Sequence, residues 1–311
     1  MSAMSAPDGI RPGSLAAWGV AARPKTLWIA AIPVAVATSL AWMAGVAVVG
    51  WVTLLALAAS LLVQVLSNLQ NDVGYTARGL ETGGRVGLPR ATSRGWLTPA
   101  QVRRAIAGGV VLAAVINVPL ALHAGWVAAA IGAASVAGAL AYMGGPKPVA
   151  YTPLGELTVF VFFGLVAVLG THYLHAGPGG IFEWLAGAAV GLHAAAVLAV
   201  NNHRDHEHDA RTGRRTFAAV FGTGASRALY GTTLWLPFVL VPAMAAMRSS
   251  PWLLAPLLCA PWAARLHRDF LAEPPGPGFN AILFRTVKLE LAFAFLLCAG
   301  AVAQRLAAGA G

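Results

Sequence analysis

Long apolar stretches separated by short polar segments dominate this chain. Nine stretches are long enough to cross the hydrocarbon core of a bilayer as helices. They run at about residues 27–45, 46–67, 104–122, 125–143, 154–174, 182–200, 229–247, 251–266 and 286–306. They lack the alternation of membrane β-barrel strands, so the pattern predicts helices. Gly and Ala are frequent inside them, and because small residues let helices approach closely in lipid, we expect one compact bundle.

Composition favours a membrane protein over a pair of soluble domains. Only 10% of the 311 residues are charged, 58% are hydrophobic, and the mean hydropathy is +0.70. We therefore expect a polar cytoplasmic N-terminus at residues 1–24 and one transmembrane domain at residues 25–308. The N-terminal segment has no apolar core of a cleavable signal, so the first span is expected to direct insertion. Cys259 and Cys298 lie within spans, where we expect them to pack as apolar residues.

Basic residues gather on one face of the predicted bundle. When the spans alternate in direction, all of the 21 Lys and Arg residues except Arg248 and Arg305 fall on the side of the N-terminus. The positive-inside rule makes this side, with the N-terminus and both acidic loops, cytoplasmic. The expected location is a bacterial inner membrane. The formal charge of +10 therefore reflects topology first and anionic lipid second. A nucleic-acid partner is not expected, because no binding motif accompanies these charges.

Two polar loops at this face open with similar patterns of amides and acids. NLQND spans residues 68–72 after the second apolar stretch, and NNHRDHEHD spans residues 201–209 after the sixth. In each, an Asn precedes an Asp by four residues, which places both side chains on one helical face. Carboxylate and amide oxygens suit Mg²⁺, which also keeps waters and shares phosphate oxygens with substrates. The repeat therefore predicts a divalent-ion site at the mouth of the bundle.

A basic stretch containing glycine follows each acidic motif, at residues 82–90 and 212–215. Guanidinium groups bind phosphate oxygens in pairs, so the loops together indicate a diphosphate site. The alternative is that acids and arginines pair with each other at a hydrophilic edge, which two equivalent copies on one face make less favourable. His203, His206 and His208 share no helical face and form no HExxH motif, which argues against zinc.

Five stretches, taken together, resemble the UbiA superfamily of intramembrane aromatic prenyltransferases. They follow the family's order: RPKTL at 23–27, SNLQNDVG at 67–74, YTPLGELTVFVFFG at 151–164, NNHRDHEHDARTGRRT at 201–216 and FNAILFRTVKLELAF at 279–293. The stretch at 151–164 is most similar to the branch that prenylates 1,4-dihydroxy-2-naphthoate in menaquinone synthesis.

The resemblance implies an all-α bundle of about nine transmembrane helices around a central cavity, capped by the two polar cytoplasmic loops. The implied reaction is Mg²⁺-dependent transfer of a polyprenyl group from polyprenyl diphosphate to an aromatic acceptor, 1,4-dihydroxy-2-naphthoate in the first instance. A 4-hydroxybenzoate-like acceptor, a transporter of an anionic lipid and a non-catalytic relative remain as alternatives. The acids lie at one face and not at the midplane, which favours the enzyme over the transporter.

Candidate site residues come from the motifs and the resemblance. The implied metal positions are Asn68, Asp72, Asp205 and Asp209, with Glu81 as a further candidate. The expected catalytic residues, which stabilise the departing diphosphate or orient its partners, are Asp72, Asp205, Asp209, Arg90 and Glu156. The expected substrate contacts are Asn68, Asn71, Lys25, Arg85, Arg204, Arg214, Arg215, Tyr151, Asn201 and Asn202.

The first motif departs from the family pattern at Tyr75, where relatives carry a second acid. Glu81 stands near the place of a third acid. Three alternatives follow: Asp72 with Asn68 and Glu81 holds the ion, the substrate pair is altered, or the fold persists without the reaction. The complete second motif and the retained arginines favour activity.

Overall fold

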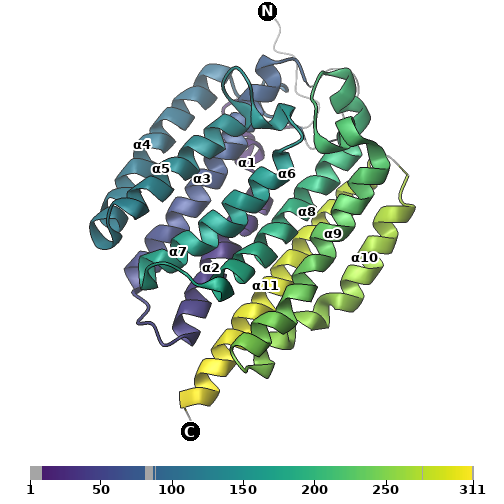
Figure 1. The fold of residues 1–311 in the computed structure, drawn as a ribbon. Helices are drawn as coiled ribbons and strands as arrows, with labels where there is room; N and C mark the ends of the chain where they lie inside the picture. Colours follow the sequence, from purple (N-terminus) through teal and green to yellow (C-terminus); the bar gives the residue numbers. More distant parts are fainter. Residues whose placement is uncertain (1–8, 81–86, 88, 275, 310–311) are drawn as a thin grey trace, which may run out of the picture.

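The computed structural model describes residues 9–80, 87, 89–274 and 276–309, which form one bundle of helices (Figure 1). No strand occurs in these residues, and eight of their helical segments are long and apolar enough to cross a membrane. Helices suit a bilayer because their backbone hydrogen bonds form within each segment. The prediction of a polytopic all-α membrane protein is confirmed.

Seven long helices form most of the bundle: α2 (Leu27–Met43), α3 (Gly50–Ala77), α4 (Pro99–Ala124), α5 (Trp126–Met143), α8 (Ile181–Arg211), α9 (Phe217–Met247) and α11 (Phe279–Gly309). One further span is composite, with α6 (Gly155–Val159), the π-helix η3 (Phe160–Val166) and α7 (Ala167–Ala176) in series. Short elements complete the chain: α1 (Leu15–Ala22), η1 (Pro24–Thr26), η2 (Val149–Tyr151), η4 (Pro251–Cys259) and α10 (Ala260–Ala272).

The predicted span at 251–266 differs from the others, because it is divided between η4 and α10. Pro256 lies inside η4, and a proline in a helix interior removes a backbone hydrogen bond and disfavours regular α-helix. The following α10 is amphipathic, with Leu266 and Phe270 buried while Arg265 and Arg268 are exposed. Both elements pack against α9 and α11 at one edge of the bundle (Figure 1).

The sequence predicted that the two polar motifs lie in loops, but in the structure both lie on helices. Helix α3 continues about ten residues past its apolar stretch to Ala77, and α8 continues likewise to Arg211. Each helix ends just before a glycine with positive φ, Gly79 at 65° and Gly213 at 75°, a conformation that glycine adopts without steric cost. The motifs are therefore held on rigid, final helical turns.

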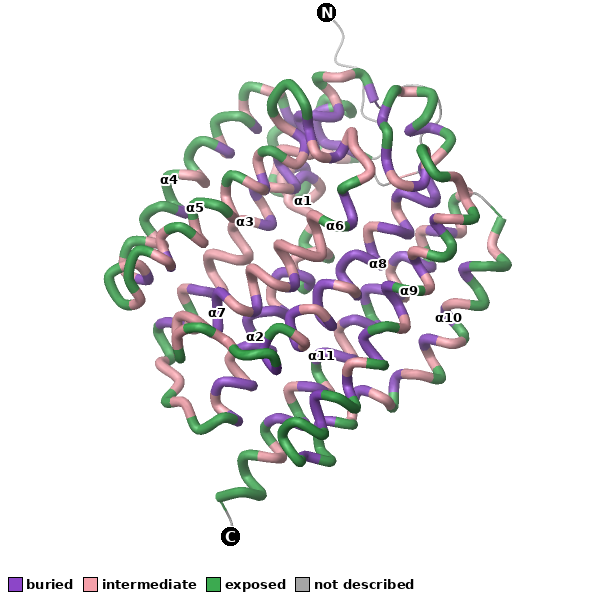
Figure 2. The backbone as a smooth tube through the Cα atoms, in the orientation of Figure 1, coloured by how far each residue is buried: buried purple, intermediate pink, exposed green. Residues whose placement is uncertain are grey.

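Helix α8 is the most buried span and α4 and α5 the most peripheral (Figure 2). Glycines bring α8 and η3 into direct backbone contact. A Cβ atom on Gly164 would lie 2.5 Å from the Gly187 carbonyl oxygen, and one on Gly191 would lie 2.5 Å from the Phe160 carbonyl oxygen. The expectation that small residues permit close packing of the bundle is confirmed at this contact.

Candidate active site

Asp72 is fully buried near the end of α3 and fixes the chain segment that follows Arg90. One carboxylate oxygen accepts a hydrogen bond from the Ala91 amide at 2.7 Å. The other accepts from the Thr92 amide at 2.9 Å and from the Thr92 hydroxyl at 2.6 Å. Such bonds to a charged acceptor are stronger than neutral ones. The carboxylate therefore holds the backbone next to Arg90 against α3.

Asn68 joins α3 to the beginning of the first span. Its amide nitrogen donates to the Ala22 carbonyl at 2.8 Å and to the Thr26 hydroxyl at 3.1 Å. Its amide oxygen accepts from Gln64, one turn earlier on α3, at 3.2 Å. The first motif is thereby tied to the junction between α1 and α2.

Arg90 belongs to the basic stretch after the first acidic motif and Arg214 to the one after the second, and both contact the same aromatic ring. The Cζ atom of Arg90 lies 3.9 Å from the centroid of the Tyr75 ring, and that of Arg214 lies 5.1 Å from it. All three side chains are buried. The sequence predicted both arginines for phosphate binding, but it treated Tyr75 only as a lost acid and did not predict that it contacts them.

In the second motif the two aspartates each bind an arginine. Arg204 donates to both oxygens of Asp205, at 2.8 and 2.7 Å, and also to the Asn280 amide oxygen on α11 at 2.7 Å. Asp209 accepts from Arg214 at 2.6 Å and from the Thr216 hydroxyl at 3.2 Å. Burial alone would lower the pKa of Arg214, but Tyr75 and Asp209 outweigh it and raise the pKa above its usual range. Arg214 therefore stays charged at the site.

Glu156 lies at the start of the composite span and faces α8. The Asn202 amide donates to one of its oxygens at 2.9 Å. The other oxygen is buried and accepts no hydrogen bond among the described residues, and the same is true of the Asn71 amide oxygen. Buried acceptors without partners are rare in native proteins and mark places where a further group can bind.

Tyr151 lies at the end of η2, where Arg78 stands 5.7 Å from its ring centroid. Burial raises the pKa of its phenol, and the positive charges of Arg78 and Arg214 only partly oppose this. The hydroxyl is therefore neutral at physiological pH and can donate a hydrogen bond.

Other predicted site residues are not joined to this cluster by a described contact. Lys25 lies 5.3 Å from the ring of Phe284, at the interface of the first span with α11. Arg215 is exposed and Asn201 is half-buried. Glu81 and Arg85 lie outside the described residues.

The histidines of the second motif make packing contacts. His203 lies against Phe270 and Phe279, and its Nδ1 is 3.1 Å from the Ser226 hydroxyl. His208 Nε2 donates to the Leu80 carbonyl at 2.7 Å, because a carbonyl oxygen can only accept. This bond ties the end of α8 to Leu80, three residues after the end of α3, a contact that no sequence signal indicated.

The donor set of the site fits Mg²⁺. Hard oxygen donors are present on Asp72, Asp205 and Asp209, each of which also accepts hydrogen bonds within the protein. The Asn71 amide oxygen is buried and has no hydrogen-bond partner among the described residues. In the described part of the chain, no three His, Cys, Asp or Glu side chains gather as a complete metal cage. Mg²⁺ does not require one, since it takes one or two protein carboxylates and completes its shell with waters and substrate phosphates.

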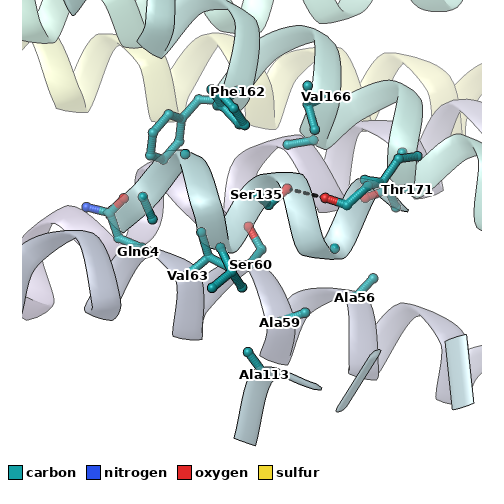
Figure 3. Close-up of a pocket in the computed structure, with 18 of the residues that line it drawn as sticks. Ala56, Ala59, Ser60, Val63, Gln64, Ala113, Ser135, Phe162, Val166 and Thr171 are labelled. Carbon is teal, nitrogen blue, oxygen red and sulfur yellow. Dashed lines mark hydrogen bonds between the residues drawn. The ribbon is translucent and has the colours of Figure 1, made fainter. Parts of the chain in front are cut away.

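An apolar cavity lies inside the bundle (Figure 3). Tyr142 lines it and also packs against the cluster that contains Tyr75. Its walls come from α2, α3, α4, α5 and the composite span, with Val63, Phe162 and Val166 among the lining residues. Gln64, which bonds to Asn68, and Thr171 lie at opposite sides of the view. The cavity therefore begins beside the first polar motif and leads away from it along apolar walls.

Glycine at position 138 makes room for one of those walls. A Cβ atom there would lie 2.5 Å from the ring of Phe162. Phe162 itself projects from the π-helix η3, and π-helical turns inside α-helices are frequent at functional sites. The ring thus closes part of the cavity next to α5.

Comparison with known proteins agrees with this geometry. The chain is 38% identical over 301 residues to 1,4-dihydroxy-2-naphthoate octaprenyltransferase of Mycobacterium tuberculosis, covering 95% of this chain and 98% of that protein. It is 33% identical over 302 residues to the protein of the same name from Escherichia coli K12, covering 94% and 97%.

Solved structures share the fold. A UbiA homologue from Archaeoglobus fulgidus bound to GPP and Mg²⁺ superposes with a TM-score of 0.66 at 12% identity, over 92% of this chain and 99% of that one. The profile of the UbiA prenyltransferase family matches residues 30–289. The helical bundle, the two motifs at its mouth and this match over most of the chain agree, and the protein belongs to the UbiA prenyltransferase family.

Proposed function

We propose that this protein transfers a polyprenyl group from polyprenyl diphosphate to 1,4-dihydroxy-2-naphthoate in a Mg²⁺-dependent reaction of menaquinone synthesis. One observation carries the proposal: Tyr142, on the wall of an apolar cavity, packs against the cluster that contains Tyr75, and the Tyr75 ring contacts the buried Arg90 and Arg214. Such a site matches a molecule with a long hydrocarbon tail and a strongly anionic head. Full-length relatives that carry the name 1,4-dihydroxy-2-naphthoate octaprenyltransferase support the choice of acceptor.

The arginines would bind the diphosphate. Arg90, Arg204 and Arg214 are buried guanidinium groups, which suit bidentate contacts to phosphate oxygens. Asp205, Asp209 and Asp72, with Asn68 and Asn71, are the proposed ligands of Mg²⁺. The ion, when bound, would supply Lewis-acid stabilisation of the charge on the departing diphosphate. The aspartates also hold the arginines in place, as the bonds from Arg204 to Asp205 and from Arg214 to Asp209 indicate.

The walls of the site would direct the prenyl group to the acceptor. When the allylic carbon–oxygen bond breaks, the electron pair leaves with the diphosphate and a carbocation remains. The apolar cavity excludes the water that would otherwise capture it. The electron-rich ring forms the new carbon–carbon bond at the allylic carbon and then loses carbon dioxide.

Glu156 would orient the acceptor. Asn202 holds one carboxylate oxygen, and the second is buried and accepts no bond from the described residues. A hydroxyl of the aromatic acceptor would satisfy that second oxygen. Tyr151, Asn201 and Arg215 belong to the same mouth of the bundle and are proposed as further substrate contacts, while Lys25 would act at its rim.

The orientation in the membrane is also a proposal. The chain is an integral membrane protein, and the excess of basic residues beside both motifs favours a cytoplasmic site in the inner membrane of a bacterium. Both substrates' polar groups would then enter from the cytoplasm, and the tail of the prenyl donor would enter from the lipid.

Turnover of the full chain in liposomes tests the reaction. We would use radiolabelled polyprenyl diphosphate and Mg²⁺ against 1,4-dihydroxy-2-naphthoate, 4-hydroxybenzoate and homogentisate. Asp205→Asn removes the charge of one proposed ligand, and Asp269→Asn removes an exposed acid paired with Arg285 on the α10 side as a matched control. Naphthoate product that is lost only in Asp205→Asn is the expected result. Product from another ring alone would reassign the acceptor, and no product from any ring would refute the proposal.

A further inference from the structure

Tyr75 occupies a position from which a side chain can reach both polar motifs. It follows Asp72 by three residues on α3, so the two side chains lie on neighbouring parts of one helical face. Its ring is 6% exposed and packs with Leu80, Met143 and Ala150. The ring is therefore packed on several sides by neighbouring residues.

The ring of Tyr75 holds two guanidinium groups at once. Arg90 lies 3.9 Å from the ring centroid and Arg214 lies 5.1 Å from it, both within the range of cation–π attraction. Arg90 and Arg214 are only 3% and 5% exposed, so water screens these contacts little. Two buried cations near each other repel. The negative face of the ring attracts both guanidinium groups, and because the ring carries no net charge, each arginine keeps its positive charge.

Hydrogen bonds to other residues also hold each arginine or the segment next to it. The segment after Arg90 is held by the bonds from Ala91 and Thr92 to Asp72. Arg214 is held by Asp209 at 2.6 Å and donates to the Ala150 carbonyl at 3.3 Å. Tyr75 thus contacts one arginine from the stretch after each acidic motif.

We propose that Tyr75 is a positioning residue that orients Arg90 and Arg214 as a preassembled pair for the substrate's diphosphate. This inference rests on the function proposed above. A carboxylate at position 75 would attract the same arginines, but it would compete with the phosphate oxygens for their hydrogen-bond donors. An aromatic face contacts the guanidinium planes, so it orients the two groups without itself taking up their N–H donors.

Two substitutions distinguish the role of the Tyr75 ring from that of its hydroxyl. Tyr75→Phe retains the aromatic face, so we expect the Kd for farnesyl diphosphate to stay within about threefold of the wild-type value. Tyr75→Leu removes the face, and we expect that Kd and the KM for the prenyl donor to rise about 10- to 30-fold. The KM for the aromatic acceptor should not change, because the proposal assigns these arginines to the diphosphate.

A graded series tests the cation–π contact even if Tyr75→Leu fails to fold. Phenylalanine and its mono-, di- and trifluorinated forms at position 75 differ little in shape, but each fluorine weakens the negative face of the ring. We would measure farnesyl diphosphate binding by calorimetry for the full chain in detergent, with melting temperature as the check on folding. A Kd that rises step by step, to about tenfold for the trifluorinated ring, supports the proposal. A Kd that stays level or falls along the series overturns it.

The binding series tests the role of Tyr75 and the acceptor panel tests the proposed reaction, so either proposal can be refuted without the other. Diphosphate binding needs no acceptor, so a stepwise series without any prenylated product would refute the proposed reaction and leave the role of Tyr75 intact. A level series together with normal turnover would refute the role of Tyr75 alone.

Discussion

Asp209 and Arg214 form an ion pair of 2.6 Å in which neither side chain is more than 5% exposed. Breaking a buried pair by removing one partner is costly, because the remaining charge is left without compensation. The pair joins the last turn of α8 to the segment before α9, and Arg214 also contacts Tyr75 from α3. It therefore contributes to stability as well as to the proposed site.

Arg214→Met should destabilise the protein by about 3–5 kcal/mol, since Asp209 would remain buried and unpaired. The double variant with Asp209→Asn should recover part of this loss. Arg215→Met is the matched control, because Arg215 is the exposed neighbour and its change should cost no more than about 0.5 kcal/mol. Denaturant unfolding in detergent measures all three, and equal effects at positions 214 and 215 would contradict the prediction.

Asp72→Asn should loosen the segment that carries Arg90. An Asn side chain turns one acceptor into an NH₂ group, which would face either the Ala91 amide or the two donors of Thr92. The amides of Ala91 and Thr92 should then exchange hydrogen at least about tenfold faster, the equivalent of 1.4 kcal/mol in local opening. Hydrogen–deuterium exchange with mass spectrometry reports this. Unchanged exchange in peptides covering those residues would show that Asp72 does not hold the segment.

Filling the cavity should change which prenyl donors are accepted. Ala56 lines the cavity on the side of Thr171, away from Gln64 (Figure 3). Ala56→Phe should lower kcat/KM for a long polyprenyl diphosphate at least about tenfold and leave geranyl diphosphate within about threefold, at a stability cost of about 1–3 kcal/mol. Val118→Phe adds the same ring on an exposed face of α4 and serves as control. An equal loss for both donors would argue that the tail does not reach Ala56.

Glu156→Gln should weaken binding of the aromatic acceptor and leave binding of the prenyl donor unchanged. Glutamine keeps the size of the side chain and can still accept from Asn202, but it replaces the unpartnered oxygen with a donor. We expect the KM for the acceptor to rise about tenfold, as for the loss of one hydrogen bond to a charged group, while the Kd for the diphosphate stays the same. Glu183→Gln, at the opposite end of α8, is the control. A rise in the diphosphate Kd instead would place Glu156 in the anion site.

The spans and the fold class could be predicted from the sequence because hydropathy acts locally. A bilayer admits only segments that satisfy their own backbone groups, so a run of about 20 apolar residues already specifies a helix. Residues 251–266 were the exception, since the break at Pro256 and the polar face of α10 depend on packing against α9 and α11. The ends of α3 and α8 were also placed too early, because polar residues can continue a helix once they are buried against other elements.

The residue types of the site were likewise readable from the sequence, because carboxylates and arginines are costly near a membrane unless they serve a function or pair. Their partners were not. The contacts of Asp72 with Thr92, of Glu156 with Asn202, and of Tyr75 with Arg90 and Arg214 join segments that are far apart in the sequence or separated by a turn, and no local spacing encodes them.

Tyr75 illustrates the division. From the sequence alone, Tyr75 shows only that an acid of the family pattern is missing, since a tyrosine near a membrane usually packs against other helices or anchors a helix at the membrane surface. The tertiary structure brings the ends of α3 and α8 together, and there the same ring contacts an arginine from each motif. The sequence by itself determined the helices and the chemical groups at their ends, through local hydropathy and charge. Only the folded bundle decided which groups meet, because that depends on distances between helices that the chain order does not contain.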